Sequence, residues 1–125
     1  MILLTDELRN RLLANGRQPD TDHAPVVKFF NPVGVGTWLA TELDADGDTL
    51  FGLADLGFGC PELGSFSLSE LISLRLPLGM GIERDLLFDA TFPLSVYAEA
   101  ARQAASIVEN ERLLRAAAAT LRGRQ

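Results

Sequence analysis

Residues 31–71 read NPVGVGTWLATELDADGDTLFGLADLGFGCPELGSFSLSEL, and this stretch decides the fold. Polar and apolar residues alternate over residues 37–43 and again over residues 49–56, as they do in strands whose side chains point to opposite faces in turn. Asp46-Gly47 lies midway between the two runs, and this dipeptide is typical of tight hairpin turns because both residues tolerate positive φ. The sequence therefore predicts a β-hairpin.

The alternation also predicts how the two strands of this hairpin pair. A two-residue turn at its centre places Leu43 opposite Leu50 and Leu39 opposite Ala54. The side chains on both faces are largely apolar, so we expect helices to cover at least part of each face.

The segments next to the hairpin predict two more strands and a corner. Residues 26–30, VVKFF, are β-branched and aromatic and predict a first strand, whereas residues 82–88 alternate as a final strand does. Between the hairpin and the final strand lies a glycine-rich corner that we expect to turn the chain sharply. The corner residues are Gly57, Gly59, Pro61 and Gly64.

Two short helices are indicated by their capping residues. Ser67 and Glu70 form a capping box that opens a helix running to about residue 74. Thr5 or Asp6 can cap a first helix near the N-terminus. We expect that helix to end at Asn15-Gly16, with Gly16 in the left-handed conformation.

The last part of the chain predicts one long helix over residues 94–122. Apolar residues recur at three-four spacing from Tyr97 onward, as in a coiled-coil seam. At 1.5 Å per residue, residues 94–121 of this helix would be about 42 Å long, and would project beyond a compact core of about 36 Å diameter. We expect its second half to form a homodimer; the alternative is a helix that frays after Glu111. The expected dimer residues are Glu111, Leu114, Ala118 and Leu121.

Together these elements predict an α+β fold in a single domain, residues 1–125. It contains an antiparallel sheet of three to five strands, an N-terminal helix, a short middle helix and a long C-terminal helix.

Composition restricts the partners and the compartment. Seventeen acidic and eleven basic residues give a net charge of −6, which repels phosphate and disfavours nucleic-acid binding. A single cysteine excludes an internal disulfide and suits a reducing compartment. No apolar run reaches the roughly 20 residues needed to cross a membrane, and the first residues do not resemble a signal peptide. We expect a cytoplasmic protein without a cofactor.

Three blocks of the sequence resemble one protein family. They are FNPVGVGTWLATELD, LFGLADLGFGCPELGSFSLSEL and GIERDLLF, and together they are similar to the small bacterial proteins of Domain of Unknown Function twenty-nine fifty-eight. The resemblance covers roughly residues 3–108 and leaves residues 109–125 unmatched. It implies a gene carried on plasmids or conjugative elements, and it implies no catalytic residues.

Candidate catalytic residues surround the glycine-rich corner. Cys60 with His23, the only histidine, would make a nucleophile and base if a third group oriented the histidine. Glu62 and Asp55 would make an acid–base pair if the corner folds back on the hairpin. The plainer alternatives are a structural cysteine and ordinary surface carboxylates.

Two further patterns have weak chemical meaning. Asp44, Asp46, Asp48 and Asp55 occupy positions 1, 3, 5 and 12 of a calcium-loop register, but Thr49 stands where that loop needs glycine, so we expect no metal site. The three Gly-x-Gly pairs, at residues 34–36, 57–59 and 79–81, lack the spacing of a phosphate loop and are interpreted as turns.

Charge placement favours protein binding. Residues 29–74 contain seven acidic residues and neither Lys nor Arg. We therefore expect a non-enzymatic accessory or regulatory protein of a mobile element that binds another protein through an acidic surface. The alternative is an enzyme or small-molecule-binding protein that uses Asp55, Cys60 and Glu62; a merely solubilising surface is the plain explanation for the charge. The expected partner-binding residues are Glu42, Asp44, Asp46, Asp48 and Asp55.

Overall fold

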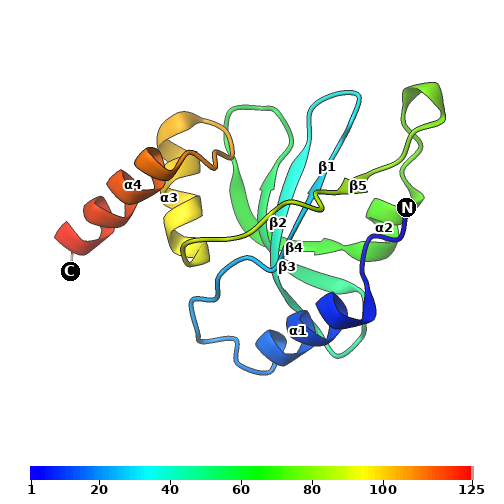
Figure 1. The fold of residues 1–125 in the computed structure, drawn as a ribbon, viewed down its shortest axis with the longest axis horizontal. Helices are drawn as coiled ribbons and strands as arrows, with labels where there is room; N and C mark the ends of the chain where they lie inside the picture. Colours follow the sequence, from blue (N-terminus) through cyan, green and yellow to red (C-terminus); the bar gives the residue numbers. More distant parts are fainter. Residues whose placement is uncertain (125) are drawn as a thin grey trace.

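The computed structural model describes residues 1–124, which adopt an α+β fold (Figure 1). The order of elements is α1 (Asp6–Gly16), β1 (Val27–Phe30), β2 (Thr37–Leu43), β3 (Thr49–Asp55), β4 (Glu62–Ser67), α2 (Leu68–Ser73), the 3-10 turn η1 (Pro77–Gly79), β5 (Glu83–Arg84), α3 (Leu94–Ala104) and α4 (Glu111–Gly123). The five strands form one antiparallel sheet in the order β4-β3-β2-β1-β5. The predicted fold class is confirmed.

β2 and β3 form the predicted hairpin at the centre of the sheet. Leu43 lies opposite Leu50, as expected, and Gly47 in the turn has a φ of 74°. The backbone N–H of Asp44 donates to the carbonyl of Thr49 and closes the connection between the strands. The hairpin register next to the turn is therefore confirmed. The predicted two-residue turn is wrong, because Gly47 donates to the carbonyl of Asp44 in a turn over residues 44–47, and of the predicted pair only Gly47 has a positive φ.

Farther from the turn, the register differs by one residue. Leu39 lies opposite Leu53 and not opposite Ala54, because the pairing shifts at a bulge around Thr41. Thr41 is buried: its hydroxyl donates to the carbonyl of Phe51 (3.2 Å), and its own carbonyl accepts from the side chain of Asn15 (2.9 Å). These bonds satisfy the polar groups that the bulge takes out of regular pairing.

A separate hydrophobic core lies on each face of the sheet, as the apolar hairpin predicts. α1 and α2 cover one face, and α3 covers the other with α4 packed against it (Figure 1). The bulge decides which residues face which core, because Leu43 joins Trp38 and Ala40 on the α1 face whereas Leu39 and Leu53 face α3.

The glycine-rich corner is shorter than predicted. Residues 56–61 form a loop, but Glu62 already begins β4, which pairs with β3 through Ser67. The predicted turn at Gly64 is wrong, since Gly64 lies inside the strand opposite Gly52. The final strand is also overestimated: only Glu83–Arg84 of residues 82–88 pairs with β1.

Capping places the two short helices correctly. The side chain of Thr5 accepts from the N–H of Leu8 at the start of α1, and the side chain of Ser67 accepts from the N–H of Glu70 at the start of α2. The left-handed end predicted at Gly16 is wrong. A Cβ at Gly16 would lie 2.3 Å from the carbonyl oxygen of Leu43, so this glycine lets α1 pack closely on β2.

The long C-terminal helix predicted over residues 94–122 is divided in two. α3 ends at Ala104, Ala105 is left-handed with a φ of 62°, and α4 begins after Asn110, whose side chain caps it. α4 turns back past α3 and lies on the side of α3 away from the sheet (Figure 1). Residues 94–122 contain neither Gly nor Pro, and the one local signal of the break is Asn110, a preferred N-cap residue.

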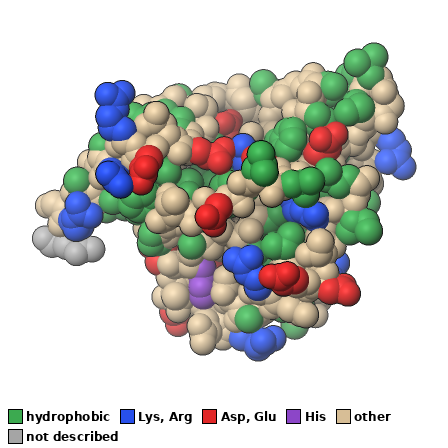
Figure 2. All heavy atoms as spheres, in the orientation of Figure 1, with side chains coloured by type: hydrophobic (Ala, Val, Ile, Leu, Met, Phe, Trp, Pro, Cys, Tyr) green, Lys and Arg blue, Asp and Glu red, His purple; other side chains and the backbone are tan. Residues whose placement is uncertain are grey.

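Charged and apolar side chains share the surface. Figure 2 shows scattered acidic and basic side chains, with hydrophobic side chains gathered at the upper right of the view, near β5 and the loop that contains η1. No helix within residues 1–124 combines the length and apolar character needed to cross a membrane.

Candidate functional site

Three connections enclose a cleft of ≈ 570 Å³ at one end of the sheet. They are the β1–β2 turn, the β3–β4 loop and the connection between α3 and α4. Two Gly-x-Gly pairs line the cleft, Gly34 with Gly36 and Gly57 with Gly59. These pairs are separate turn signals in the sequence, and the fold brings them together. The volume is within the range of roughly 300–1,000 Å³ that small-molecule sites occupy.

Asp55, at the end of β3, holds two of these connections in place. One of its carboxylate oxygens accepts from the N–H of Gly57 and the other from the N–H of Ile107, each at 2.9 Å. The first bond stabilises the β3–β4 loop, and the second ties the α3–α4 connection to the sheet. Both oxygens of Asp55 are therefore engaged in joining these two connections to β3.

Lys28, which the sequence reasoning missed, also lines the cleft. It is the only lysine of the chain, and its ammonium group contacts the carboxylates of Glu109 (2.5 Å) and Asp85 (3.5 Å) and lies 6.0 Å from the ring centroid of Phe30. The available signal was a lone charge within the apolar run VVKFF. Because two carboxylates neutralise this charge, Lys28 is poorly placed to attract an anion into the cleft.

Asn31, another polar residue of the cleft, is bonded within the chain. Asn31 accepts from the N–H of Val33 (2.9 Å) and donates to the carbonyl of Val35 (3.1 Å), which fixes the β1–β2 turn. Across residues 1–124, no buried side-chain nitrogen or oxygen lacks a hydrogen-bond partner. The cleft therefore has a suitable size, and Lys28, Asn31 and Asp55, three of its polar side chains, are already engaged within the chain.

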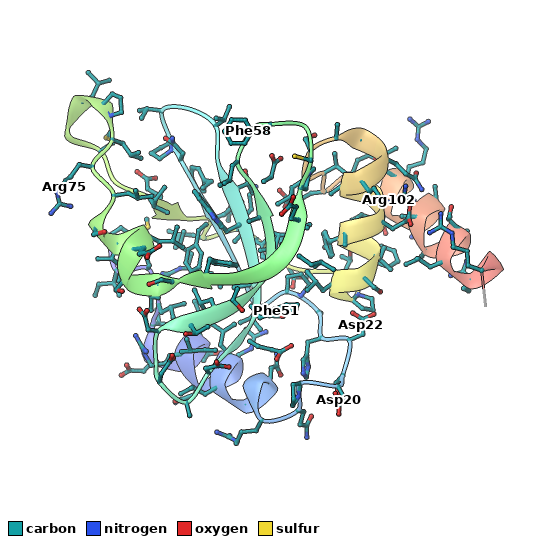
Figure 3. All side chains as sticks on the ribbon, turned by 180° about the vertical axis from the view of Figure 1, so that it is seen from behind. Asp20, Asp22, Phe51, Phe58, Arg75 and Arg102 are labelled. Carbon is teal, nitrogen blue, oxygen red and sulfur yellow. The ribbon has the colours of Figure 1, made fainter. Side chains whose placement is uncertain are left out.

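The expected catalytic residues do not converge. Cys60 is exposed and shares with Glu62 a separate hollow of ≈ 160 Å³. The Nε2 atom of His23 lies 2.8 Å from the carbonyl of Gln18, in the segment between α1 and β1. Asp22 of that segment lies at the opposite end of the sheet from Phe58 of the β3–β4 loop (Figure 3).

Neither proposed catalytic pair has the required geometry. His23 cannot serve Cys60 as a base across the sheet, and it lies close enough to Glu42 to oppose the rise in the pKa of that carboxyl. Asp55 faces the large cleft whereas Glu62 lines the small hollow. The structure thus separates the four candidate residues into three places.

Two of the expected partner-binding carboxylates are occupied by their own chain. Asp46 accepts from the N–H of Asp48, the N–H of Thr49 and the hydroxyl of Thr49, at 2.6–2.8 Å. Asp48 accepts from the hydroxyl of Ser67 (2.7 Å) and the N–H of Ser69 (2.8 Å), so it joins the hairpin turn to the start of α2. The hydroxyls of Thr49 and Ser67, respectively, are the main reasons that the pKa of Asp46 and the pKa of Asp48 are both lowered.

The remaining carboxylates do not complete one acidic surface. Asp44 is exposed at the hairpin turn. Glu42 is partly buried, and this desolvation raises its pKa, an effect opposed by nearby His23. Asp55 is at the far end of β3, about 20 Å from the turn at 3.3 Å per residue. The five residues therefore lie at both ends of the hairpin.

The expected dimer residues are already partly covered within the chain. Leu114 and Ala118 are buried against α3, Leu121 is half-buried, and Glu111 is exposed and pairs with Arg115. A dimer through Leu114 and Ala118 would therefore require α4 to leave its own α3.

Exposed apolar side chains form a surface beside the cleft. We name this surface the apolar tip; it consists of Val33 and Val35 from the β1–β2 turn and Leu56 and Phe58 from the β3–β4 loop. Phe58 is 82% exposed and Val35 is 70% exposed. The two loops touch, since a Cβ at Gly57 would lie 2.8 Å from the side chain of Val35. Phe58 extends outward at the top of Figure 3.

The chain is thus an α+β protein with a shallow cleft and an exposed apolar tip. Residues 3–108 match the family described as Protein of unknown function (DUF2958), and the chain belongs to this family. The match ends within the α3–α4 connection, so α4 lies outside it. No curated protein and no solved structure matches the chain.

Proposed function

We propose that this protein is a non-enzymatic accessory or regulatory protein of a bacterial mobile element, and that it acts in the cytoplasm by binding another protein through the apolar tip. The genetic setting rests on the plasmid- and conjugative-element context implied by the resemblance to the family. The binding role rests on the surface of the molecule.

The observation that carries the proposal is the pairing of two exposed apolar loops. Phe58, Val35 and Leu56 are 82%, 70% and 51% exposed, and the contact between Gly57 and Val35 holds their loops together. Clustered apolar side chains on a surface are typical of protein interaction sites. A partner that covers them gains about 25 cal/mol for each Å² of apolar surface removed from water.

Charge defines the chemistry of the partner. Glu62 lines the same hollow as Leu56 and Phe58, and residues 29–74 contain no Lys or Arg. The best complement is therefore an apolar segment flanked by basic side chains. Asp46 and Asp48 accept hydrogen bonds from their own chain, so the acidic residues act mainly through the net charge of −6, which attracts such a partner over distance.

Affinity capture from a host that carries the element tests this proposal. The bait is the intact protein, the Phe58→Ser variant, or the Leu78→Ser variant as matched control; Leu78 is 89% exposed in η1 and is not one of the four residues of the apolar tip. We expect a protein retained by the wild type and by Leu78→Ser to bind Phe58→Ser at least about 30-fold more weakly, the size of an interface hot spot. Binding should also weaken with added salt. Equal capture by the two variants would refute the role of the apolar tip.

The size of the cleft favours a second candidate, a small-molecule-binding protein. Asp55 lines this cleft, but Cys60 and Glu62 do not, and the engaged carboxylate of Asp55 favours binding over catalysis. A metabolite that raises the melting temperature should lose its effect in Ser106→Trp, which fills the cleft, and keep it in Phe58→Ser. The opposite pattern would place the ligand at the apolar tip.

A further inference from the structure

The reversal between α3 and α4 is held in a conformation that its own sequence disfavours. Ala105 has a φ of 62° and a ψ of 17°, in the left-handed region where a Cβ is unfavourable and glycine is usual. Residues 94–122 contain no Gly or Pro, and alanine has the highest helix propensity. The strain is therefore concentrated at Ala105, and a connection that opened would release it.

Three sets of contacts keep the reversal closed. The N–H of Ile107 donates to Asp55 (2.9 Å), and Glu109 pairs with Lys28. The third set is the packing of α4 on α3, which buries Leu114 and Ala118. The first two sets hold the connection itself. The third set requires only that an α4 helix, from the same chain or from another copy, packs on α3.

Glu99 shows why α3 needs this cover. Its side chain is only 4% exposed, and it accepts from Gln103 (2.8 Å) and Arg102 of α3 and from Arg124 (2.5 Å) at the end of α4. An α4 that swung into solvent would remove Arg124 from Glu99 and expose the buried side chains of both helices. Simple detachment of α4 is therefore unfavourable.

We propose that α4 exchanges between two copies of this chain and forms a helix-swapped homodimer. In the dimer, α4 of one copy packs on α3 of the other, so Leu114 and Ala118 are buried again and Arg124 pairs with Glu99 across the interface. The connection opens and Ala105 leaves the left-handed region. The exchanged contacts are those of the monomer, and the released strain at Ala105 favours the dimer. This inference is independent of the apolar tip.

Two substitutions at the exposed Ala105 test the hinge in opposite directions. Ala105→Gly removes the penalty for positive φ and should favour the monomer, whereas Ala105→Val increases it and should favour the dimer. The backbone penalty at residue 105 changes the equilibrium between the closed and the open connection by a factor of about 5. Each dimer opens two connections, so the dimer dissociation constant should change by about 25-fold. Sedimentation equilibrium over a range of concentrations measures this constant. Dissociation constants equal in both variants, or monomers throughout, would overturn the proposal.

Cross-linking then tests whether α4 crosses between copies. Ala104 and Leu113 line one small hollow between α3 and α4. Ala104→Cys and Leu113→Cys are made in separate chains, each with Cys60→Ser, so that no chain can form an internal disulfide. After unfolding, mixing and refolding at high concentration, oxidation should give a peptide that links residues 104 and 113, identified by mass spectrometry. A chain that carries both cysteines is the control and should link residues 104 and 113 within the monomer. If this control links and the mixed dimer does not, the copies associate without exchanging α4.

Discussion

The two ends of the central hairpin contrast in composition and in availability. The end at the β2–β3 turn is rich in carboxylates, but Asp46 and Asp48 together accept five hydrogen bonds from their own chain. The opposite end carries the apolar tip, where Phe58 and Val35 are largely exposed. The polar β2–β3 turn is thus bonded to its own chain. The apolar tip at the other end of the hairpin remains accessible to a partner.

Close packing reinforces this difference. At the turn end, Gly16 of α1 lies directly against the backbone of β2. At the tip end, a Cβ at Gly57 would approach the side chain of Val35 and not backbone, and a Cβ at Gly59 would meet no atom within 4 Å. The turn end should therefore respond to substitution with a loss of stability, and the tip end with a loss of binding.

Gly16→Ala is expected to have the largest effect on stability. Its Cβ would lie 2.3 Å from the carbonyl oxygen of Leu43, so α1 must shift, at a cost of about 2 kcal/mol of unfolding free energy. Gly59→Ala is the control and should cost about 1 kcal/mol, because only its φ of 82° is unfavourable. Urea unfolding measures both. An equal loss in the two variants would remove the contrast between the ends.

Gly47→Val tests the turn itself and should destabilise the protein by about 1 kcal/mol or more. Gly47 has a φ of 74°, which a β-branched residue adopts only with strain, and Val would also weaken the turn that sets the hairpin register. The midpoint of urea unfolding measures the loss. An unchanged midpoint would show that the turn tolerates Val without strain.

Local signals in the sequence predicted much of the fold. Alternation and Asp46-Gly47 gave the hairpin, and Thr5 and Ser67 gave the helix starts, because these features act over a few residues. The bulge at Thr41 could not be predicted this way, since it depends on a bond from Asn15 of α1. The break at Ala105 likewise depends on a distant partner, Asp55, which binds Ile107.

The sites were harder to predict than the fold. The charge of Asp46 predicted a partner-binding residue, and the thiol of Cys60 predicted a catalytic one. Only the tertiary structure shows that Asp46 is internally bonded and that Cys60 lies far from His23. The apolar tip gave no sequence signal, because exposed and buried apolar residues look alike until burial is known. Phe58, which is exposed, and Phe29, which is completely buried, illustrate this.

Acid should weaken the turn end through Asp48. The bond from Ser67 is the main reason that its pKa is lowered in the folded state, so its stabilising contribution is present above the unfolded carboxylate pKa of about 4 and is lost as pH falls through the folded value. Asp48→Asn should therefore reduce the loss of stability between pH 5 and pH 2. Asp20→Asn, which removes a carboxylate exposed at the molecular surface, is the control and should keep the wild-type slope.

This test relies on the difference between variants because Glu42 acts in the opposite direction. Desolvation raises the pKa of Glu42, so its protonation favours the folded state as pH falls. Urea midpoints at each pH give the slopes. Identical slopes for wild type and Asp48→Asn would contradict the role of the Asp48 bonds.

Calcium should have the smallest effect, although the turn has the register of a calcium loop. An ion at Asp44, Asp46 and Asp48 would have to displace the hydrogen bonds that Asp46 and Asp48 accept from residues 48, 49, 67 and 69. β2 and β3 also hold the turn between two paired strands, whereas a calcium loop wraps the ion between helices. Within residues 1–124, no group of three or more His, Cys, Asp or Glu side chains has the spacing of a metal site.

Calorimetry with calcium should therefore give no binding tighter than about 1 mM, the weak end of the range for such loops, and Asp46→Ala should behave like the wild type. Micromolar binding that Asp46→Ala abolishes would mean that the turn can release its own hydrogen bonds to bind an ion, and the contrast between the two ends of the hairpin would no longer hold.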